Sequence, residues 1–280
     1  MTLNNQAAVI TGASSGLGAA AARALAARGV RVALLARTRP ALEAVAAEIQ
    51  AAGGLARVYP ADLADAAAAE RAVHTALADL GAPAVVVNSA GAGRWLATEE
   101  TEPAEAVQMM AVPYFAAFYV TRACLPAMLA RGRGRIVTIN SPAARLVWPG
   151  AAGYTAARWA LYGFTEALRA DLHGTGLGVT SILCGEVHTP YFTHNPGTLE
   201  RAPWLARRLI PALEAGQVAE ALVAAVERGQ REVVLPGMLR VFLTLHAVAP
   251  RLTSWLAVWS GWQHSRRSHE PASAPRLDSA

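Results

Sequence analysis

A phenol and a permanent cation lie four residues apart in the segment YTAAR, at Tyr154 and Arg158. On a helix, residues four apart project from one face, so these two side chains can meet. A neighbouring cation favours the phenolate form of a tyrosine, and a tyrosine in that setting can transfer a proton. The alternative is that Tyr154 is an ordinary amphipathic helix residue and Arg158 a surface cation.

A second candidate site lies near the N-terminus, in the segment TGASSGLG at 11–18. An apolar, β-rich run precedes this segment, and an alanine-rich helical segment follows it directly. Its glycines let the backbone turn sharply and approach a phosphate, towards which the first N–H groups of the helix point. A tight turn would also explain the glycines, but the order strand, loop, helix favours a dinucleotide-binding site.

The end of the second apolar run indicates which dinucleotide is bound. An NAD site usually has a carboxylate there that binds the ribose 2′-hydroxyl. The segment LLARTRP has no acid, and Arg37 could pair with a 2′-phosphate, helped by Thr38 or Arg39. The alternative for Arg37 is a solvated loop residue. The missing carboxylate predicts NADP, with NAD the less favoured cofactor.

Short apolar runs rich in β-formers alternate with longer segments of helical length and spacing. The expected strands lie in the runs that begin at Ala7, Val30, Leu55, Pro83, Gly134, Gly178 and Arg231. The expected helices are 16–28, 40–52, 65–79, 103–131, 152–173 and 216–228. Strands that alternate with helices imply right-handed crossovers. We therefore expect an α/β fold, a doubly wound parallel sheet of about seven strands with helices on both faces.

Taken together, these motifs resemble those of the short-chain dehydrogenase/reductase family, over about residues 6–236. The glycine loop resembles its TGxxxGxG motif, and Asp62 resembles the acid that holds the adenine amino group. NSAG at 88–91 resembles the family's NNAG, in which Asn88 would help tie the sheet and line the adenosine pocket. Ser141 precedes Tyr154 by thirteen residues, the spacing typical of the family's catalytic serine and tyrosine.

The resemblance implies a single Rossmann-type domain that interconverts a carbonyl and a secondary alcohol. Tyr154 would transfer the proton, Ser141 would hydrogen-bond the same oxygen, and Arg158 would replace the lysine that binds the nicotinamide ribose. The residues expected at the cofactor are Gly12, Ser14, Ser15, Gly16, Leu17, Gly18, Arg37, Asp62, Leu63, Asn88, Ala90, Gly91, Tyr154, Arg158, Val187 and Thr189.

Three positions depart from the family pattern. Arg158 keeps a positive charge but cannot readily lose a proton as a lysine can. Pro113 stands where the family has an asparagine. A proline kinks a helix and frees the carbonyl four residues earlier, here that of Met109, which could still hold a relay water. Cys184 replaces the proline of a Pro-Gly pair. The main alternative is therefore a catalytically impaired dinucleotide-binding scaffold or sensor, and a third possibility is an isomerase or epimerase.

The substrate side is predicted from the family's pocket and from chain composition. Trp148, His188, Tyr191 and Phe192 fall where the family's pocket is lined, which indicates an apolar carbonyl or alcohol substrate. The segment 190–211 has four prolines and no clear strand, so it is expected to form a lid. Core packing is the competing explanation for each aromatic residue.

Residues 1–237 are expected to form the NAD(P)-binding oxidoreductase domain, 238–264 an amphipathic helical extension broken at Pro250, and 265–280 a disordered tail. Trp255, Trp259 and Trp262 share a helical face followed by arginines, which is typical of a helix lying on lipid. The other interpretation, which we favour, is packing against another subunit or over the substrate mouth. The family resemblance implies a homodimer or homotetramer.

Composition excludes several other classes of function. The formal charge is +5 and every non-histidine cation is an arginine, but no basic patch is interleaved with aromatics, so nucleic acid is not an expected partner. Two cysteines without ligand spacing predict no metal site. The sequence shows no secretory signal and no run of ~18 uncharged apolar residues, so a spanning helix is not expected. We expect a cytoplasmic protein with possible peripheral membrane contact.

Overall fold

The computed structural model describes residues 1–263. It confirms the expected sheet of seven strands. They are β1 (Ala7–Thr11), β2 (Arg31–Ala36), β3 (Leu55–Pro60), β4 (Val85–Asn88), β5 (Gly134–Asn140), β6 (Leu177–Cys184) and β9 (Glu232–Leu235). All neighbouring strands pair in parallel, in the order β3-β2-β1-β4-β5-β6-β9. The order reverses between β1 and β4, so a crevice opens at the carboxyl ends of these two strands.

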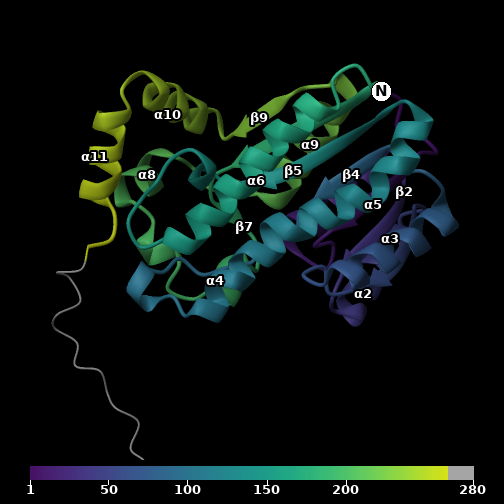
Figure 1. Cartoon of the computed structure of the whole chain (residues 1–280), viewed down its shortest axis with the longest axis horizontal. Coiled ribbons are helices and arrows are strands. Elements are labelled where there is room, and N and C mark those ends of the chain that lie inside the picture. The colour runs from purple at the N-terminus through teal and green to yellow at the C-terminus, as the bar shows by residue number, and fades with distance from the viewer. Residues whose placement is uncertain (264–280) are drawn as a thin grey trace, which may run out of the picture.

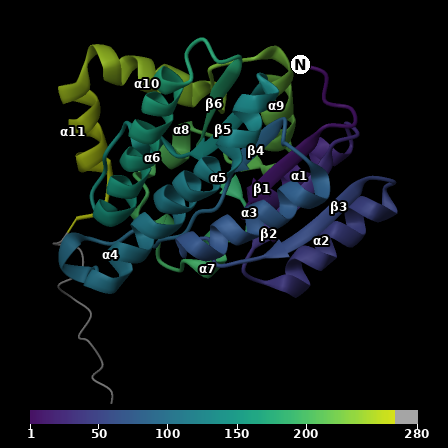
Figure 2. The same cartoon turned by 45° about the vertical axis from the view of Figure 1, so that its right-hand side comes forward.

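Helices cover both faces of the sheet (Figures 1 and 2). One face packs against α1 (Gly16–Ala26), α2 (Arg39–Ala51) and α9 (Ala215–Arg228), and the other against α3 (Ala66–Leu80), α5 (Ala116–Arg131) and α6 (Ala152–Asp171). In β1, Ala8 and Ile10 lie in the first core, whereas Ala7 and Val9 lie in the second. Successive side chains of a strand point to opposite faces, and both faces are buried here. The strands are therefore continuously apolar.

The expected helix 103–131 is interrupted in the structure. It consists of α4 (Pro103–Met110), a π-helical turn η2 (Ala111–Phe115) and α5. In the π turn the Ala116 N–H donates to the Ala111 carbonyl, five residues earlier. The buried Pro113 lies within this turn and has no N–H to donate. The irregularity thus occurs at the position predicted from the proline, as a widened turn.

This same segment, Pro103–Arg131, is long and apolar enough to cross a membrane by length and composition. In the fold, however, Val120, Cys124 and Met128 pack into the core between α3, α6 and the sheet. The segment is therefore a core helix of the domain.

The lid and the extension follow the sheet in the chain. A two-stranded parallel ladder of β7 (Val187–His188) and β8 (Leu213–Glu214) joins the two ends of the lid. Between them lie α7 (Tyr191–His194), η4 (Leu199–Arg201) and α8 (Trp204–Leu209). The extension forms α10 (Gly237–Val248) and α11 (Pro250–Ser260), separated at Pro250 as predicted. Figure 1 shows both at the end of the molecule opposite α2 and α3. The expected tail, 265–280, lies outside the described residues.

Candidate active site

The glycine loop packs so closely that side chains are excluded at two positions. Gly12 has a φ of +63°, and a Cβ there would lie 2.9 Å from Ala90 Cα. A Cβ at Gly18 would lie 2.2 Å from the Gly12 carbonyl oxygen. The Thr11 hydroxyl accepts the N–H groups of Ser89 and Ala90, both at 3.0 Å, and so ties β1 to the loop after β4. The result is a narrow backbone cradle at the start of α1, where a pyrophosphate fits.

The residues expected at the adenosine end lie at the carboxyl ends of β2 and β3. Arg37 is exposed, lines the cavity and has no ion-pair partner among residues 1–263. Asp62 accepts the Ala64 N–H at 3.0 Å, and the buried Leu63 lies beside it in the same wall. Asn88 does not line the cavity as expected. Its buried amide donates to Thr121 at 2.9 Å and ties β4 to α5 behind the wall.

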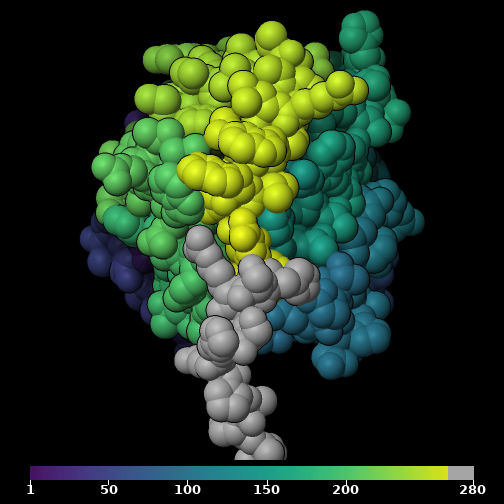
Figure 3. All heavy atoms as spheres, turned by 90° about the vertical axis from the view of Figure 1, so that its left-hand side faces the viewer, coloured from purple at the N-terminus to yellow at the C-terminus, as the bar shows by residue number. Residues whose placement is uncertain are grey.

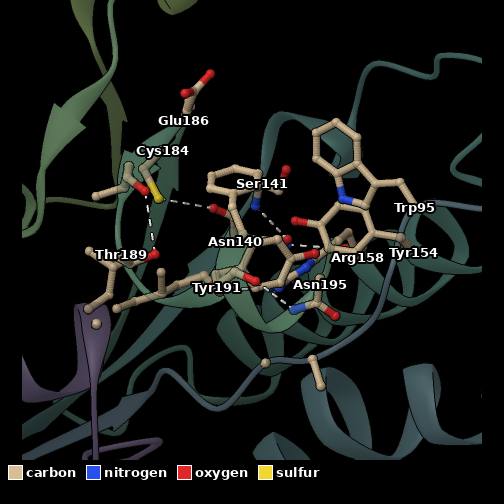
Figure 4. A pocket seen from close by; sticks show the side chains of 18 of the residues that line it. Trp95, Asn140, Ser141, Tyr154, Arg158, Cys184, Glu186, Thr189, Tyr191 and Asn195 are labelled. Atoms are coloured by element: carbon tan, nitrogen blue, oxygen red, sulfur yellow. Dashed lines mark hydrogen bonds between the residues drawn. The ribbon is translucent and has the colours of Figure 1, made fainter. Parts of the chain in front are cut away.

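Tyr154 and Arg158 meet on one face of α6, as their spacing predicted (Figure 4). Both are buried, with 5% and 8% of their surface exposed. The Arg158 guanidinium carbon lies 4.9 Å from the centre of the Tyr154 ring, which is a cation–π contact. Arg158 Nη1 donates to the Ile139 carbonyl at 3.3 Å, while its buried Nε has no hydrogen-bond partner among residues 1–263. The guanidinium is therefore held in place while Arg158 lines the cavity.

Ser141 follows β5 and faces the same part of the cavity (Figure 4). Its hydroxyl oxygen accepts the Ala143 N–H at 3.2 Å. Its own N–H donates to Asn140 Oδ1 at 2.8 Å, and the Asn140 amide donates to the Arg158 carbonyl at 3.1 Å. Because the Ser141 hydroxyl only accepts in these contacts, its hydrogen is free to donate to a substrate oxygen.

A second phenol, Tyr191, enters this site from the lid. Its hydroxyl donates to the Gly93 carbonyl at 2.6 Å. Burial, and next the nearby Tyr154 phenol, raise the pKa of Tyr191, and the opposing effect of Arg158 is smaller. Tyr191 is therefore neutral at ordinary pH with its hydrogen already donated, and it serves to attach the lid to the loop after β4.

Cys184, at the end of β6, also lines this cavity. Its thiol donates to the Asn140 carbonyl at 3.6 Å. Burial raises the pKa of Cys184 to about 11, although the Arg158 charge opposes this shift. The neutral thiol is not a nucleophile, so in place of the expected proline it acts as a small apolar residue.

All predicted cofactor residues except Asn88, together with Ser141, line one continuous cavity of about 680 Å³. Thr189 lies directly over the glycine loop: a Cβ built on Gly16 would be 3.4 Å from Thr189 Cβ. The predicted substrate residues Trp148, Tyr191 and Phe192 also line the cavity.

His188 is not brought to the cavity. Its neighbours Val187 and Thr189 line it, and residues alternate in direction along the short strand β7. The His188 ring therefore points outwards, with 62% of its side chain exposed and Nδ1 2.7 Å from a Glu214 carboxylate oxygen. No group of three or more His, Cys, Asp or Glu residues that could hold a metal ion occurs within 1–263.

Among the lining residues that were not predicted, two sets shape the substrate side. Trp95, in the loop after β4, lies 4.9 Å from Trp148 and 5.5 Å from Tyr154 between ring centres. Trp95 follows the NSAG motif closely, at the carboxyl edge of the sheet, and this position could have predicted that it lines the cavity. The inner residues of the extension also line the cavity: they are Leu239, Phe242, Thr253, Leu256, Ala257 and Ser260. The extension thus packs over the substrate side, one of the two interpretations of its sequence.

Comparison with known proteins agrees with this geometry. Residues 6–198 match the family described as short chain dehydrogenase. The uncharacterized oxidoreductase YxnA of Bacillus subtilis is 30% identical over 281 residues, covering 99% of this chain and 78% of YxnA. The fatty acyl-CoA reductase of Acinetobacter baylyi is 31% identical over 252 residues, covering 89% of this chain and 82% of the reductase.

A solved metagenomic short-chain oxidoreductase in complex with NADP has 33% sequence identity and a TM-score of 0.71, covering 84% of this chain and 98% of that chain. The family match includes the glycine loop, Ser141, Tyr154 and Arg158. These motifs, the nucleotide cradle and the aligned relatives agree. The chain belongs to the short-chain dehydrogenase family and is an oxidoreductase of the nicotinamide dinucleotide-dependent kind.

Proposed function

We propose that the protein is an NADP-dependent oxidoreductase that interconverts a carbonyl and a secondary alcohol on an apolar substrate. The observation that carries this proposal is the buried contact between the Tyr154 ring and the Arg158 guanidinium, 4.9 Å apart, beside the free hydroxyl hydrogen of Ser141. A proton donor, a cation and an oxygen-binding hydroxyl line one cavity, which is the arrangement that carbonyl reduction needs.

The residues present fit a dinucleotide. The cradle of Gly12 and Gly18 admits backbone approach to the pyrophosphate, and the unpaired Arg37 supplies a cation where a 2′-phosphate would lie. Thr189 and Arg158 would hold the nicotinamide end. When bound, the cofactor supplies or accepts the hydride. The absence of a carboxylate after β2 supports NADP over NAD.

In the reduction direction, Tyr154 gives its hydroxyl proton to the carbonyl oxygen as that oxygen gains negative charge. Ser141 donates a hydrogen bond to the same oxygen and holds it in position. The Arg158 charge, fixed against the tyrosine ring, stabilises the phenolate that remains. In the oxidation direction the same phenolate accepts the proton of the alcohol.

The substrate side of the cavity supports an apolar substrate. Trp95, Trp148 and Phe242 form its walls, and the inner face of α11 adds Leu256 and Ala257. Such walls bind hydrocarbon by removing it from water, and the polar contacts to the substrate are made at its reacting oxygen by Ser141 and Tyr154. The name of one relative, a fatty acyl-CoA reductase, is consistent with a long apolar substrate.

The experiment that tests the proposal is a fluorescence titration with NADPH and NADH, followed by an absorbance screen at the nicotinamide band against apolar ketones and aldehydes. Replacing Arg37 by alanine should weaken NADPH binding by about tenfold or more, because a charge-assisted hydrogen bond is lost, and leave NADH unchanged. Arg23, which pairs with Glu48 at 2.6 Å and does not line the cavity, is the matched control, and its replacement by alanine should leave the binding of both nucleotides unchanged. Equal binding of both nucleotides would contradict the NADP assignment, and tight binding without turnover would favour the scaffold alternative.

We also propose that two copies associate through the α5–α6 face. Phe115, Phe118 and Trp159 are exposed there, with 37%, 39% and 49% of their surface accessible. The Phe118 ring lies 5.8 Å from Phe164 of α6, so the aromatic surface is continuous across both helices. An apolar surface of this kind on paired helices suits a two-fold interface.

A further inference from the structure

Helix α11 buries two hydroxyl residues on its inner side, beside Leu256 and Ala257. Thr253 and Ser260 are buried on the cavity side, where their hydroxyls bond to carbonyls of their own helix, Thr253 to Ala249 at 3.1 Å and Ser260 to Leu256 at 2.6 Å. The opposite side exposes large apolar residues: Leu252 50%, Trp255 59%, Val258 52% and Trp259 50%. A surface helix of a protein surrounded only by water has the reverse arrangement.

The exposed apolar surface continues onto neighbouring helices. Trp255 stacks on Trp259 at 5.9 Å between ring centres, and Trp259 contacts Trp204 of α8 at 5.3 Å. Further exposed apolar residues on α8 and α10 are Leu209, Met238, Val241, Leu245 and Val248. Figure 3 shows α10, α11 and the lid side by side on this side of the molecule. We call this set of residues the tryptophan face.

The tryptophan face is mounted firmly on the domain. Arg201, 4% exposed, pairs with Glu100 at 2.6 Å and lies over the ring of Trp262, 4.9 Å from its centre. Gly261 packs so closely on the ring of Pro149 that a Cβ would lie 2.9 Å from it. Because the end of α11 is fastened in this way, its exposed tryptophans are held outwards by the fold.

The charged side chains that the segments of this face contribute are of one sign. Residues 201–213 and 233–263 contain no aspartate or glutamate. The arginines of these segments that lie on the exposed surface include Arg208, Arg240 and Arg251, and within 1–263 none of these three has a carboxylate partner. The face is therefore an apolar centre with tryptophans, bordered by cations.

We propose that the tryptophan face docks on the surface of an anionic lipid bilayer. Tryptophan prefers the headgroup depth of a bilayer, apolar side chains enter the acyl boundary, and arginines pair with lipid phosphates. A second copy of the chain is a poorer occupant, because a two-fold contact would bring the same arginines together. Since α8 and α11 also form a wall of the substrate cavity, docking brings the cavity next to lipid.

The test is flotation of the full chain, without cofactor, on vesicles of phosphatidylcholine alone or mixed with phosphatidylglycerol. We expect binding to the mixed vesicles that weakens as salt is raised. The double substitution Trp255→Ala/Trp259→Ala should lower the partition coefficient by about tenfold or more, since two headgroup-depth rings are lost. Arg208→Glu/Arg251→Glu should lower binding to the mixed vesicles by about tenfold or more and change binding to phosphatidylcholine little.

Controls place an apolar-to-alanine and an arginine-to-glutamate change outside both proposed faces. Val107→Ala on α4, where the side chain is 67% exposed, and Arg71→Glu on α3 should float like the natural chain, and circular dichroism should show every variant folded. Failure of the natural chain to float, or equal loss in the controls, would overturn the proposal. So would light scattering in which only the Trp255/Trp259 variant loses a subunit, since the face would then be an interface between copies. Flotation requires no turnover, so a failed activity screen would leave this result standing.

Discussion

Two phenols share the active site, and their hydroxyl hydrogens are used differently. The Tyr191 hydroxyl donates to the Gly93 carbonyl, and burial keeps it neutral. Tyr154 lies under the Arg158 guanidinium and beside Ser141 in the cavity. We therefore propose Tyr154, the side chain that the sequence indicated through its spacing, as the phenol that transfers the proton.

Exchange of each tyrosine for phenylalanine separates these roles. Tyr154→Phe should lower turnover by about 10² to 10⁴, the usual contribution of a general acid, with NADPH affinity changed little. Tyr191→Phe should keep turnover within about tenfold and cost ~1 kcal/mol of stability, because one neutral hydrogen bond is lost. The measurements are steady-state kinetics and thermal unfolding. A larger loss of turnover for Tyr191→Phe than for Tyr154→Phe would contradict the proposal, because Tyr191 would then be the phenol that transfers the proton to the substrate.

Arg158 is fitted to its surroundings as an arginine. Its Nη2 packs so closely on Gly91 that a Cβ there would lie 2.9 Å away. Its Nη1 donates to the Ile139 carbonyl, and the planar guanidinium lies over the Tyr154 ring. A lysine ammonium cannot make these contacts together. Arg158→Lys should therefore lower kcat by about tenfold, and the uncharged Arg158→Met by more, because the phenolate then loses its cation. A rise in kcat for Arg158→Lys would instead mean that the natural arginine impairs the site.

At the scale of elements, the glycine loop depends on backbone contacts that no side chain can replace. A methyl group at Gly18 meets the Gly12 carbonyl at 2.2 Å, so α1 must shift away from β1. Gly18→Ala should cost about 1–3 kcal/mol, as other overpacked sites do, and greatly weaken NADPH binding.

A helical glycine with open space around it provides the control for this substitution. At Gly163 of α6, a methyl group would meet no atom within 4 Å outside its own stretch of helix. Gly163→Ala should leave NADPH binding unchanged and raise stability by up to ~1 kcal/mol, because alanine favours the helix. Thermal unfolding and the fluorescence titration measure both effects. If Gly18→Ala and Gly163→Ala were equally stable, the glycine loop would accommodate the methyl group by relaxing, and the prediction for Gly18 would be wrong.

For the whole molecule, two exposed apolar faces have different expected partners. The α5–α6 face around Phe118, where the exposed Arg122 pairs with Glu70 at 3.5 Å, is proposed for subunit contact. The tryptophan face, with Arg208, Arg240 and Arg251, is proposed for lipid. Phe118→Glu should convert dimers to monomers in light scattering, since burial of a charge opposes association. Val241→Glu, on α10, should leave the subunit count unchanged. The reverse pattern would exchange the roles of the two faces.

The sequence by itself determined the features that depend on neighbours along the chain. The alternating apolar runs predicted seven parallel strands, and the glycine loop, the absent acid near Arg37 and the four-residue spacing of Tyr154 and Arg158 indicated the site. Pro113 marked the widened turn and Pro250 the start of a new helix, because proline acts on its own backbone, although Pro126 lies inside α5 without ending it.

Only the tertiary structure decided which side chains reach the cavity. Asn88 lies behind its wall and His188 points outwards, whereas Trp95 and the inner face of α11 enter it. These outcomes depend on packing between segments distant in sequence, which a local pattern does not encode. The pattern of α11 is the clearest case: its tryptophan stripe left lipid contact and packing against protein both open, and in the structure Thr253, Leu256, Ala257 and Ser260 face the cavity while Trp255 and Trp259 stay at the surface. Burial is set by what a helix packs against, and for α11 those neighbours include α8 and the turn at Pro149, both far away in the chain.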